Sequence, residues 1–174
     1  MGIFYDYFIA PGDTEAAAAI DRTGGPGQPA SPINQKGRGL FGRRQKDAAS
    51  ADQGFTYPTI EDTGIDPVVQ GGTLEELLTG RAYEEIELDQ RWGQSLAVRD
   101  GGERLVLTLT DGLIDALAQA TPEQLASAAG PWSHTEEFWG TGDPEELTAL
   151  LHDLSGLARE ARTRGESVYC WVSL

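Results

Sequence analysis

The strongest hydrophobic pattern along the chain lies between Asp143 and Gly165. Leucines and one alanine recur there at helical spacing and form a single stripe, made of Leu147, Leu150, Leu151, Leu154, Leu157 and Ala161. Asp143 and Pro144 are typical of a helix start, and Gly165 is typical of a helix end. The pattern predicts a helix from Asp143 to about Arg164 that anchors the hydrophobic core.

Both ends of the chain predict β-strands. Residues 3–9 are aromatic and β-branched, and Pro11-Gly12 follows them. Residues 167–174 carry apolar side chains on both faces of an extended strand, which indicates a central strand covered on both sides. Residues 95–99 and 103–109 flank Asp100-Gly101-Gly102 and predict a hairpin.

Shorter helices are predicted between these strands. We expect Asp13 or Thr14 to cap the first helix, and Thr73 with Glu76 to form a capping box for a second that Gly80 ends. Further helical segments are predicted at 81–89, at 111–120 and from Thr121 onward, where Thr121 gives an N-cap, Pro122 a first-turn proline and Gln124 a glutamine at the third helical position, as in a capping box. Together the elements predict an α+β fold, with a small mixed or antiparallel sheet packed against several helices.

Residues 22–54 differ in composition from the rest of the chain. They are rich in Gly, Pro, Ser, Gln and Ala, and they cannot bury enough apolar surface to offset the loss of chain entropy. We expect a long flexible loop there, within a single domain that spans residues 1–174. Six basic residues against two acidic ones give this loop a net charge of +4, which leaves −19 for the rest because the whole chain carries −15.

The acidic remainder narrows the choice of partners and locations. Its field repels nucleic acid and anionic membranes and favours a basic protein partner, although high charge also simply keeps a protein soluble. No apolar stretch reaches the roughly 18–20 residues of a membrane span, and residues 1–13 lack the basic start of a secretory signal. We therefore expect a cytoplasmic protein without membrane contact.

The segment from Trp132 to Trp139 holds the only candidate catalytic group. His134 lies near Glu136 and Glu137, and a histidine with a carboxylate neighbour can act as a general base in a hydrolase. The alternative, which we favour, is structural: Ser133 or Thr135 caps a short helix whose aromatic residues pack on the core.

No other motif predicts catalysis, a metal or a cofactor. His152 lies on the polar side of its predicted helix, and Cys170 lies on a buried strand face. Residues 37–42 match G-x-G-x-x-G, but no strand precedes them and no helix follows, so we interpret the match as chance.

A basic segment inside the long loop is a candidate for partner binding. It contains Lys36, Arg38, Arg43, Arg44 and Lys46, with Leu40 and Phe41 among them. These side chains could hold an acidic or nucleic-acid partner, or they could fold back onto the acidic remainder of the chain. Trp132 and Trp139 are the other partner-binding candidates.

From about Leu105 onward the chain resembles the YfbM-like family of small bacterial proteins. The resemblance rests on RLVLTLTDGLIDALAQATPEQLASA, on DPEELTALLHDLSGLAREARTRGESVYCWVSL and on LEELLTG at 74–80. It implies an α+β fold and carries no established activity, so no catalytic residue is carried over. The excess of arginine over lysine also fits a bacterial genome rich in G and C.

These observations lead to two functional hypotheses. The first is a non-enzymatic protein-interaction module, such as an acidic inhibitor or immunity-type protein that neutralises a basic partner. The second is a hydrolase that uses His134 with Glu136 or Glu137. Nucleic-acid binding through Lys36–Lys46 is a weaker third, because the overall charge opposes it, and homo-oligomer formation stays open.

Overall fold

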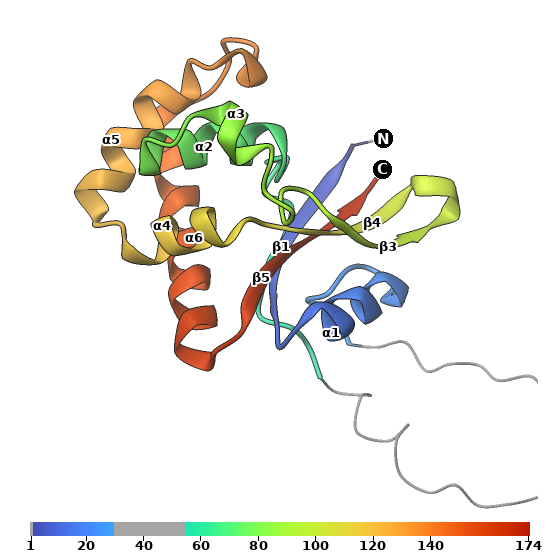
Figure 1. Ribbon diagram of the computed structural model, residues 1–174. Helices are drawn as coiled ribbons and strands as arrows, with labels where there is room; N and C mark the ends of the chain where they lie inside the picture. Colours follow the sequence, from blue (N-terminus) through green and yellow to red (C-terminus); the bar gives the residue numbers. More distant parts are fainter. Residues whose placement is uncertain (1, 30–54) are drawn as a thin grey trace, which may run out of the picture.

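The computed structural model describes residues 2–29 and 55–174, and a five-stranded antiparallel sheet lies at its centre (Figure 1). The strands are ordered β2-β1-β5-β4-β3, and every pair is antiparallel. Their bounds are β1 Phe4–Ala10, β2 Thr59–Ile60, β3 Ser95–Arg99, β4 Arg104–Thr108 and β5 Ser167–Ser173. The predicted α+β class is confirmed, and the sheet is antiparallel.

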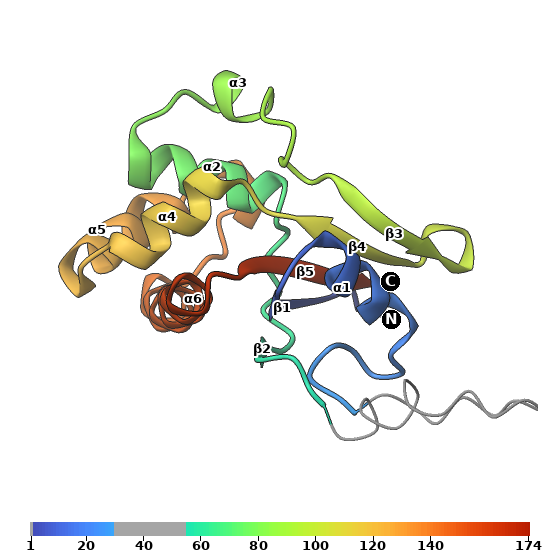
Figure 2. The same cartoon turned by 60° about the horizontal axis from the view of Figure 1, so that its bottom comes forward.

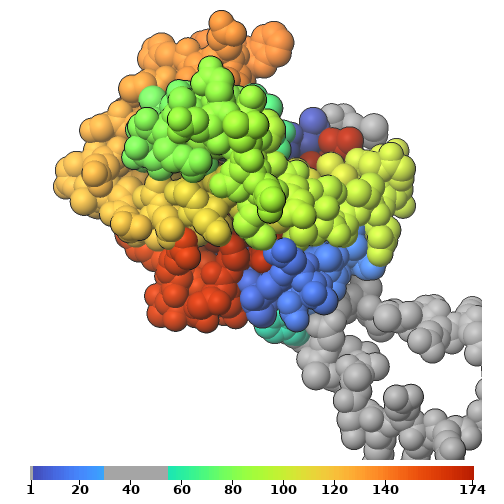
Figure 3. Space-filling model, viewed as in Figure 1, coloured from blue at the N-terminus to red at the C-terminus, as the bar shows by residue number. Residues whose placement is uncertain are grey.

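Helices cover the two faces of the sheet unequally. The α-helices are α1 Asp13–Ala18, α2 Val69–Thr79, α3 Tyr83–Ile86, α4 Asp111–Gln119, α5 Pro122–Ser133 and α6 Pro144–Arg164. The described residues also contain three 3-10 turns, η1 Ala19–Asp21, η2 Asp100–Gly102 and η3 Glu136–Phe138. Figure 2 shows α2, α4, α5 and α6 gathered on one side and α1 on the other. On the surface, α2, α4 and α6 stack in that order beside the hairpin (Figure 3).

The C-terminal strand β5 lies in the middle of the sheet, as its apolar faces predicted. Val168, Cys170 and Val172 belong to the larger core beneath the four helices. Tyr169 and Trp171 point to the opposite face and pack in a smaller core with residues of α1 and η1. Burial raises the pKa of the Cys170 thiol well above its ordinary value, so the thiol is unreactive packing at neutral pH.

The long helix α6 also forms as its pattern predicted. The Asp143 carboxylate accepts hydrogen bonds from the backbone N–H groups of Glu145 and Glu146, and Gly165 ends the helix with a φ of 68°. The predicted stripe is buried against the larger core, except that Leu150 is half-buried. This helix contacts β5, β1 and β2 of the sheet, and it also packs against α4 and α5.

Two predicted helix caps are wrong. Gly12 precedes α1 without a side-chain cap, and Asp13 instead pairs with Arg91 and accepts a hydrogen bond from Tyr169. Thr73 lies inside α2, where its hydroxyl donates to the Gln70 carbonyl at 3.0 Å. For Asp13, partners distant in sequence take the place of the predicted local bond. For Thr73, the helix starts earlier than predicted.

The acceptor at the start of α2 lies earlier in the chain than the predicted capping box. Asp66 Oδ1 accepts from the N–H groups of Val68 and Val69 at 2.8 and 2.9 Å. The helix end was predicted correctly, since Gly80 adopts a left-handed conformation with a φ of 73°. Of the predicted loop at 22–54, only residues 22–29 fall within the described part, and they contain no helix or strand.

Candidate functional site

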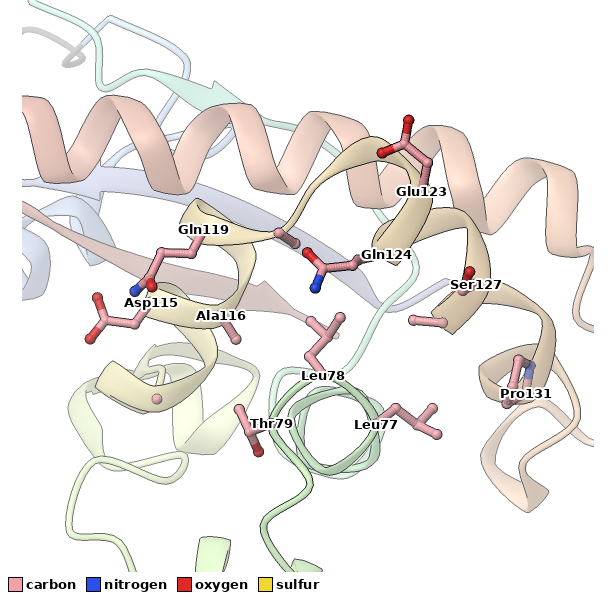
Figure 4. A pocket seen from close by; sticks show the side chains of 13 residues that line it. Leu77, Leu78, Thr79, Asp115, Ala116, Gln119, Glu123, Gln124, Ser127 and Pro131 are labelled. Atoms are coloured by element: carbon pink, nitrogen blue, oxygen red, sulfur yellow. The ribbon is translucent and has the colours of Figure 1, made fainter.

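A hollow of about 800 Å³ lies between α2, α4 and α5 (Figure 4). We call it the helical groove. Leu77 and Leu78 come from the last turn of α2, and Figure 4 shows Leu78 between Ala116 of α4 and Gln124 of α5. The space exists because both facing helices present short side chains here, namely Ala116, Ala120, Ser127 and Ala128.

The groove combines an apolar floor with a polar rim. Leu77 is exposed, and Leu78 continues into the larger core. The rim contains two carboxylates and two amides, from Asp115, Glu123, Gln119 and Gln124, and no lysine, arginine or histidine lines the hollow among the residues that the structure describes. The hollow therefore presents an exposed leucine beside carboxylate and amide side chains.

The carboxylate of Glu123 is held in its ionised form. Glu123 lies in the first turn of α5, where its own backbone N–H and the Thr121 hydroxyl lower the pKa of its side chain. Thr121 and Gln124 form the predicted capping box at this helix start. The other rim carboxylate, Asp115, pairs with Arg162 of α6. Of the two rim carboxylates, Glu123 is therefore the one that does not pair with Arg162 and is available to a partner.

A buried glutamate lies just beneath one end of the groove. Glu75 of α2 is 1% exposed; its Oε1 accepts from Arg81 Nη1 at 3.0 Å and its Oε2 from the Thr110 hydroxyl. The Thr110 oxygen in turn accepts from Leu113 N–H and so caps α4. Burial raises the pKa of Glu75, although Thr110 and Arg81 oppose that shift.

The chain packs tightly around this glutamate. A Cβ at Gly112 would collide with Glu75 Oε1, so α4 can approach α2 this closely only with glycine there. Glu75 thus joins α2 to the start of α4, two walls of the groove, and does not itself line the hollow. Sequence reasoning missed it, because within LEELLTG both glutamates look like solvated helix positions.

The structure does not bring His134 into hydrogen-bonding contact with the other predicted catalytic residues, Glu136 and Glu137. His134 is exposed, and its Nδ1 lies 2.8 Å from the Gly130 carbonyl oxygen and 3.1 Å from Ser133 Oγ. Within residues 2–29 and 55–174, no hydrogen bond or ion pair connects His134 with Glu136 or Glu137. None of the three lines the helical groove.

The residues expected to cap a short helix here do something else. Ser133 is the last residue of α5, and its hydroxyl donates to the Gly130 carbonyl at 2.8 Å. Thr135 precedes η3 without a side-chain cap, and its hydroxyl donates to the Trp132 carbonyl at 2.8 Å. Both side chains therefore satisfy carbonyls at the end of α5, where backbone acceptors have no helical partner.

The two tryptophans proposed for partner binding have opposite environments. Trp132 is 0% exposed, donates from Nε1 to the Gln70 carbonyl at 3.0 Å, and packs edge-on against Phe138. Trp139 is 90% exposed and has a φ of 53°. Only Trp139 is available to a partner. The basic candidates Lys36, Arg38, Arg43, Arg44 and Lys46 lie outside the described residues.

The described part of the chain contains neither a metal-binding cluster nor a membrane-spanning helix. Its His, Cys, Asp and Glu side chains form no group of three or more that could hold a metal ion. None of its helices combines the length and apolarity that crossing a membrane requires. No protein-family model, curated protein or solved structure matches the chain, so the resemblance to the YfbM-like family stays a prediction.

Proposed function

We propose that this protein is a non-enzymatic binding protein that takes a basic, amphipathic segment of another protein into the helical groove. The observation that carries the proposal is the lining of the groove, an exposed leucine floor inside a rim with carboxylates and, among the described residues, no cation. Such a lining complements a helix with leucine-like side chains on one face and lysine or arginine beside them.

The charge of the whole chain supports the same partner class. A net charge of −15 attracts a basic protein over distances comparable to the Debye length and raises its rate of association. The apolar floor then supplies contact that salt does not screen. This combination suits an acidic inhibitor or immunity-type protein that neutralises a basic partner in the bacterial cytoplasm.

A labelled amphipathic peptide with leucines on one face and lysines on the other tests the proposal. We expect the double variant Leu77→Ser/Glu123→Gln to bind it at least about tenfold more weakly than the native protein, because floor contact and rim charge are both lost. Fluorescence anisotropy at low and at physiological salt gives the affinities.

A matched double variant controls for charge and hydrophobicity outside the groove. Leu88 is exposed on the loop after α3, and Glu145 lies in the first turn of α6 as Glu123 lies in the first turn of α5. Leu88→Ser/Glu145→Gln should leave the affinity within about twofold. Equal losses in both double variants would show that the peptide binds the acidic surface at large, and the proposal would be wrong.

A further inference from the structure

A second hollow, of about 510 Å³, lies on the opposite face of the sheet from the helical groove. It is near the strand ends where the N- and C-termini lie side by side (Figures 1 and 2). We call it the sheet-end pocket. Its sheet wall is formed by Phe4, Asp6, Arg104, Trp171 and Ser173. The strand register aligns these residues in two rows, Phe4–Ser173–Arg104 and Asp6–Trp171.

The pocket is the part of this sheet face that α1 leaves uncovered. The next row along the strands, Phe8 and Tyr169, is buried in the small core with Ala16, Ala19 and Ile20. The chain that follows η1 passes through Thr23 and Gly24, which form one edge of the pocket. A rigid sheet therefore supplies the floor, and two loops supply the rim.

Asp6 is the central polar group of this pocket. It is 6% exposed, and its Oδ1 accepts from the Asp62 backbone N–H at 2.8 Å. Its Oδ2 takes part in none of the hydrogen bonds or ion pairs found among residues 2–29 and 55–174. Gly25, at a φ of 96°, lies so close to this oxygen that a Cβ would be 2.5 Å from it. Within the described part, the fold thus holds a carboxylate with one oxygen unpaired.

Keeping this carboxylate buried costs free energy. Burial raises the pKa of Asp6, and the neighbouring Glu61 and Asp62 carboxylates raise it further, while the hydrogen bond from Asp62 N–H opposes them. Trp171 adds a second unsatisfied group, since its buried Nε1–H has no hydrogen-bond partner among the described residues. Within the described part, one Asp6 carboxylate oxygen and the buried Trp171 N–H thus lie beside the hollow without partners, which is typical of a binding site.

The arginines at the pocket have other partners. Arg104 binds the Asp100 carboxylate at 2.6 Å and the Ile20 carbonyl at 3.1 Å. Arg22 donates to the carbonyls of Gln28 and Phe55 at 2.9 and 2.7 Å, and its guanidinium lies 4.6 Å from the ring centroid of Tyr57. Neither forms an ion pair with Asp6 within the described part, so the acidic character of the pocket persists.

We infer that the sheet-end pocket binds a small organic cation, an ammonium or guanidinium group on a short apolar stem. The charged group would pair with Asp6 Oδ2 near Glu61 and Asp62, and the stem would lie against the rings of Trp171 and Phe4. Phe4 is exposed at the pocket mouth, which leaves its ring free for this contact. The same chemistry could come from a free amine or from a lysine or arginine side chain of a protein.

Titration of the full chain with butylammonium and butylguanidinium ions tests this inference, with butanol as the neutral isostere. The readout is the indole N–H signal of Trp171 in proton–nitrogen NMR spectra, assigned with Trp171→Phe. We expect both cations to shift this signal, and Asp6→Asn to weaken binding at least about tenfold. Asp153→Asn, at an exposed position of α6, should change it by less than about twofold.

The stability of the variant separates a ligand-binding role from a structural one. The Asp6→Asn substitution keeps an acceptor for the Asp62 N–H and removes a buried charge, so we expect the melting temperature at neutral pH to be unchanged or higher. A lower melting temperature would assign Asp6 to the scaffold and overturn the inference. Binding of butanol as tight as that of the cations, or no shift with either cation, would also overturn it.

A second titration, with blocked amino acids, identifies the source of the cation. Blocked lysine and arginine residues, N-acetylated and with C-terminal methylamides, present the same groups on a peptide backbone. If they bind as tightly as the free ions and Asp6→Asn weakens them equally, the pocket accepts a protein side chain. If only the free ions bind, it accepts a small metabolite. The helical groove lies on the other face, so this outcome is independent of the function proposed above.

Discussion

Replacement of Trp132 by alanine is expected to lower the free energy of unfolding by about 3–5 kcal/mol. The side chain is 0% exposed, donates a hydrogen bond to the Gln70 carbonyl and packs edge-on against Phe138. Its removal leaves a large cavity where α5 meets α2, and it leaves the Gln70 carbonyl without this donor. Urea denaturation of the full chain, followed by circular dichroism, measures the effect.

The matched control is the tryptophan seven residues later. Trp139 is 90% exposed, so Trp139→Ala should change the free energy of unfolding by less than about 0.5 kcal/mol. Similar losses for the two variants would contradict the packing described here. A difference of the expected size means that, of this pair, only Trp139 can be examined as a partner contact without unfolding the protein.

The elements predicted correctly are those whose signal is local. Helix α6 has a long stripe, a proline at its start and a glycine at its end, and β5 has two apolar faces. Each needs only neighbouring residues to define it, since helix and strand periodicities arise within one segment. The same holds for the capping box at Thr121.

The wrong predictions arose where distant residues compete for the same groups. Thr73 and Glu76 match a capping box in sequence, but Asp66 captures the first N–H groups of α2 and starts the helix earlier. Asp13 looks like a cap for α1, but Arg91, far along the chain, takes its carboxylate. Arg91 also keeps the pKa of the Asp13 side chain below its ordinary value.

Neither hollow could be predicted from the sequence, because each is made by segments that meet only in the fold. The helical groove needs short side chains on α4 and α5 to face the end of α2. The sheet-end pocket did leave one signal, since Asp6 interrupts an otherwise apolar strand. An isolated acid in such a strand predicts a buried carboxylate, and a buried carboxylate needs a partner in the fold or in a ligand.

Replacement of Glu75 by alanine is expected to lower the free energy of unfolding by about 2–4 kcal/mol. The change leaves the Thr110 hydroxyl without its buried acceptor and opens a cavity between α2 and α4. Arg81 is partly exposed and can be solvated by water, which limits the loss. Glu84→Ala, at an exposed position of α3, should cost less than about 0.5 kcal/mol in the same urea denaturation.

The pH dependence of Glu75→Gln distinguishes the charge of Glu75 from its shape. Because burial raises the pKa of Glu75 in the folded protein, its proton stabilises the fold fully below the unfolded value of 4.5, and that contribution is lost as the pH rises through the folded pKa. Glutamine has no such proton. The native protein should therefore lose stability relative to Glu75→Gln between acidic and neutral pH. A constant difference, or one that grows in favour of the native protein as the pH rises, would mean that Arg81 and Thr110 outweigh burial at this carboxylate.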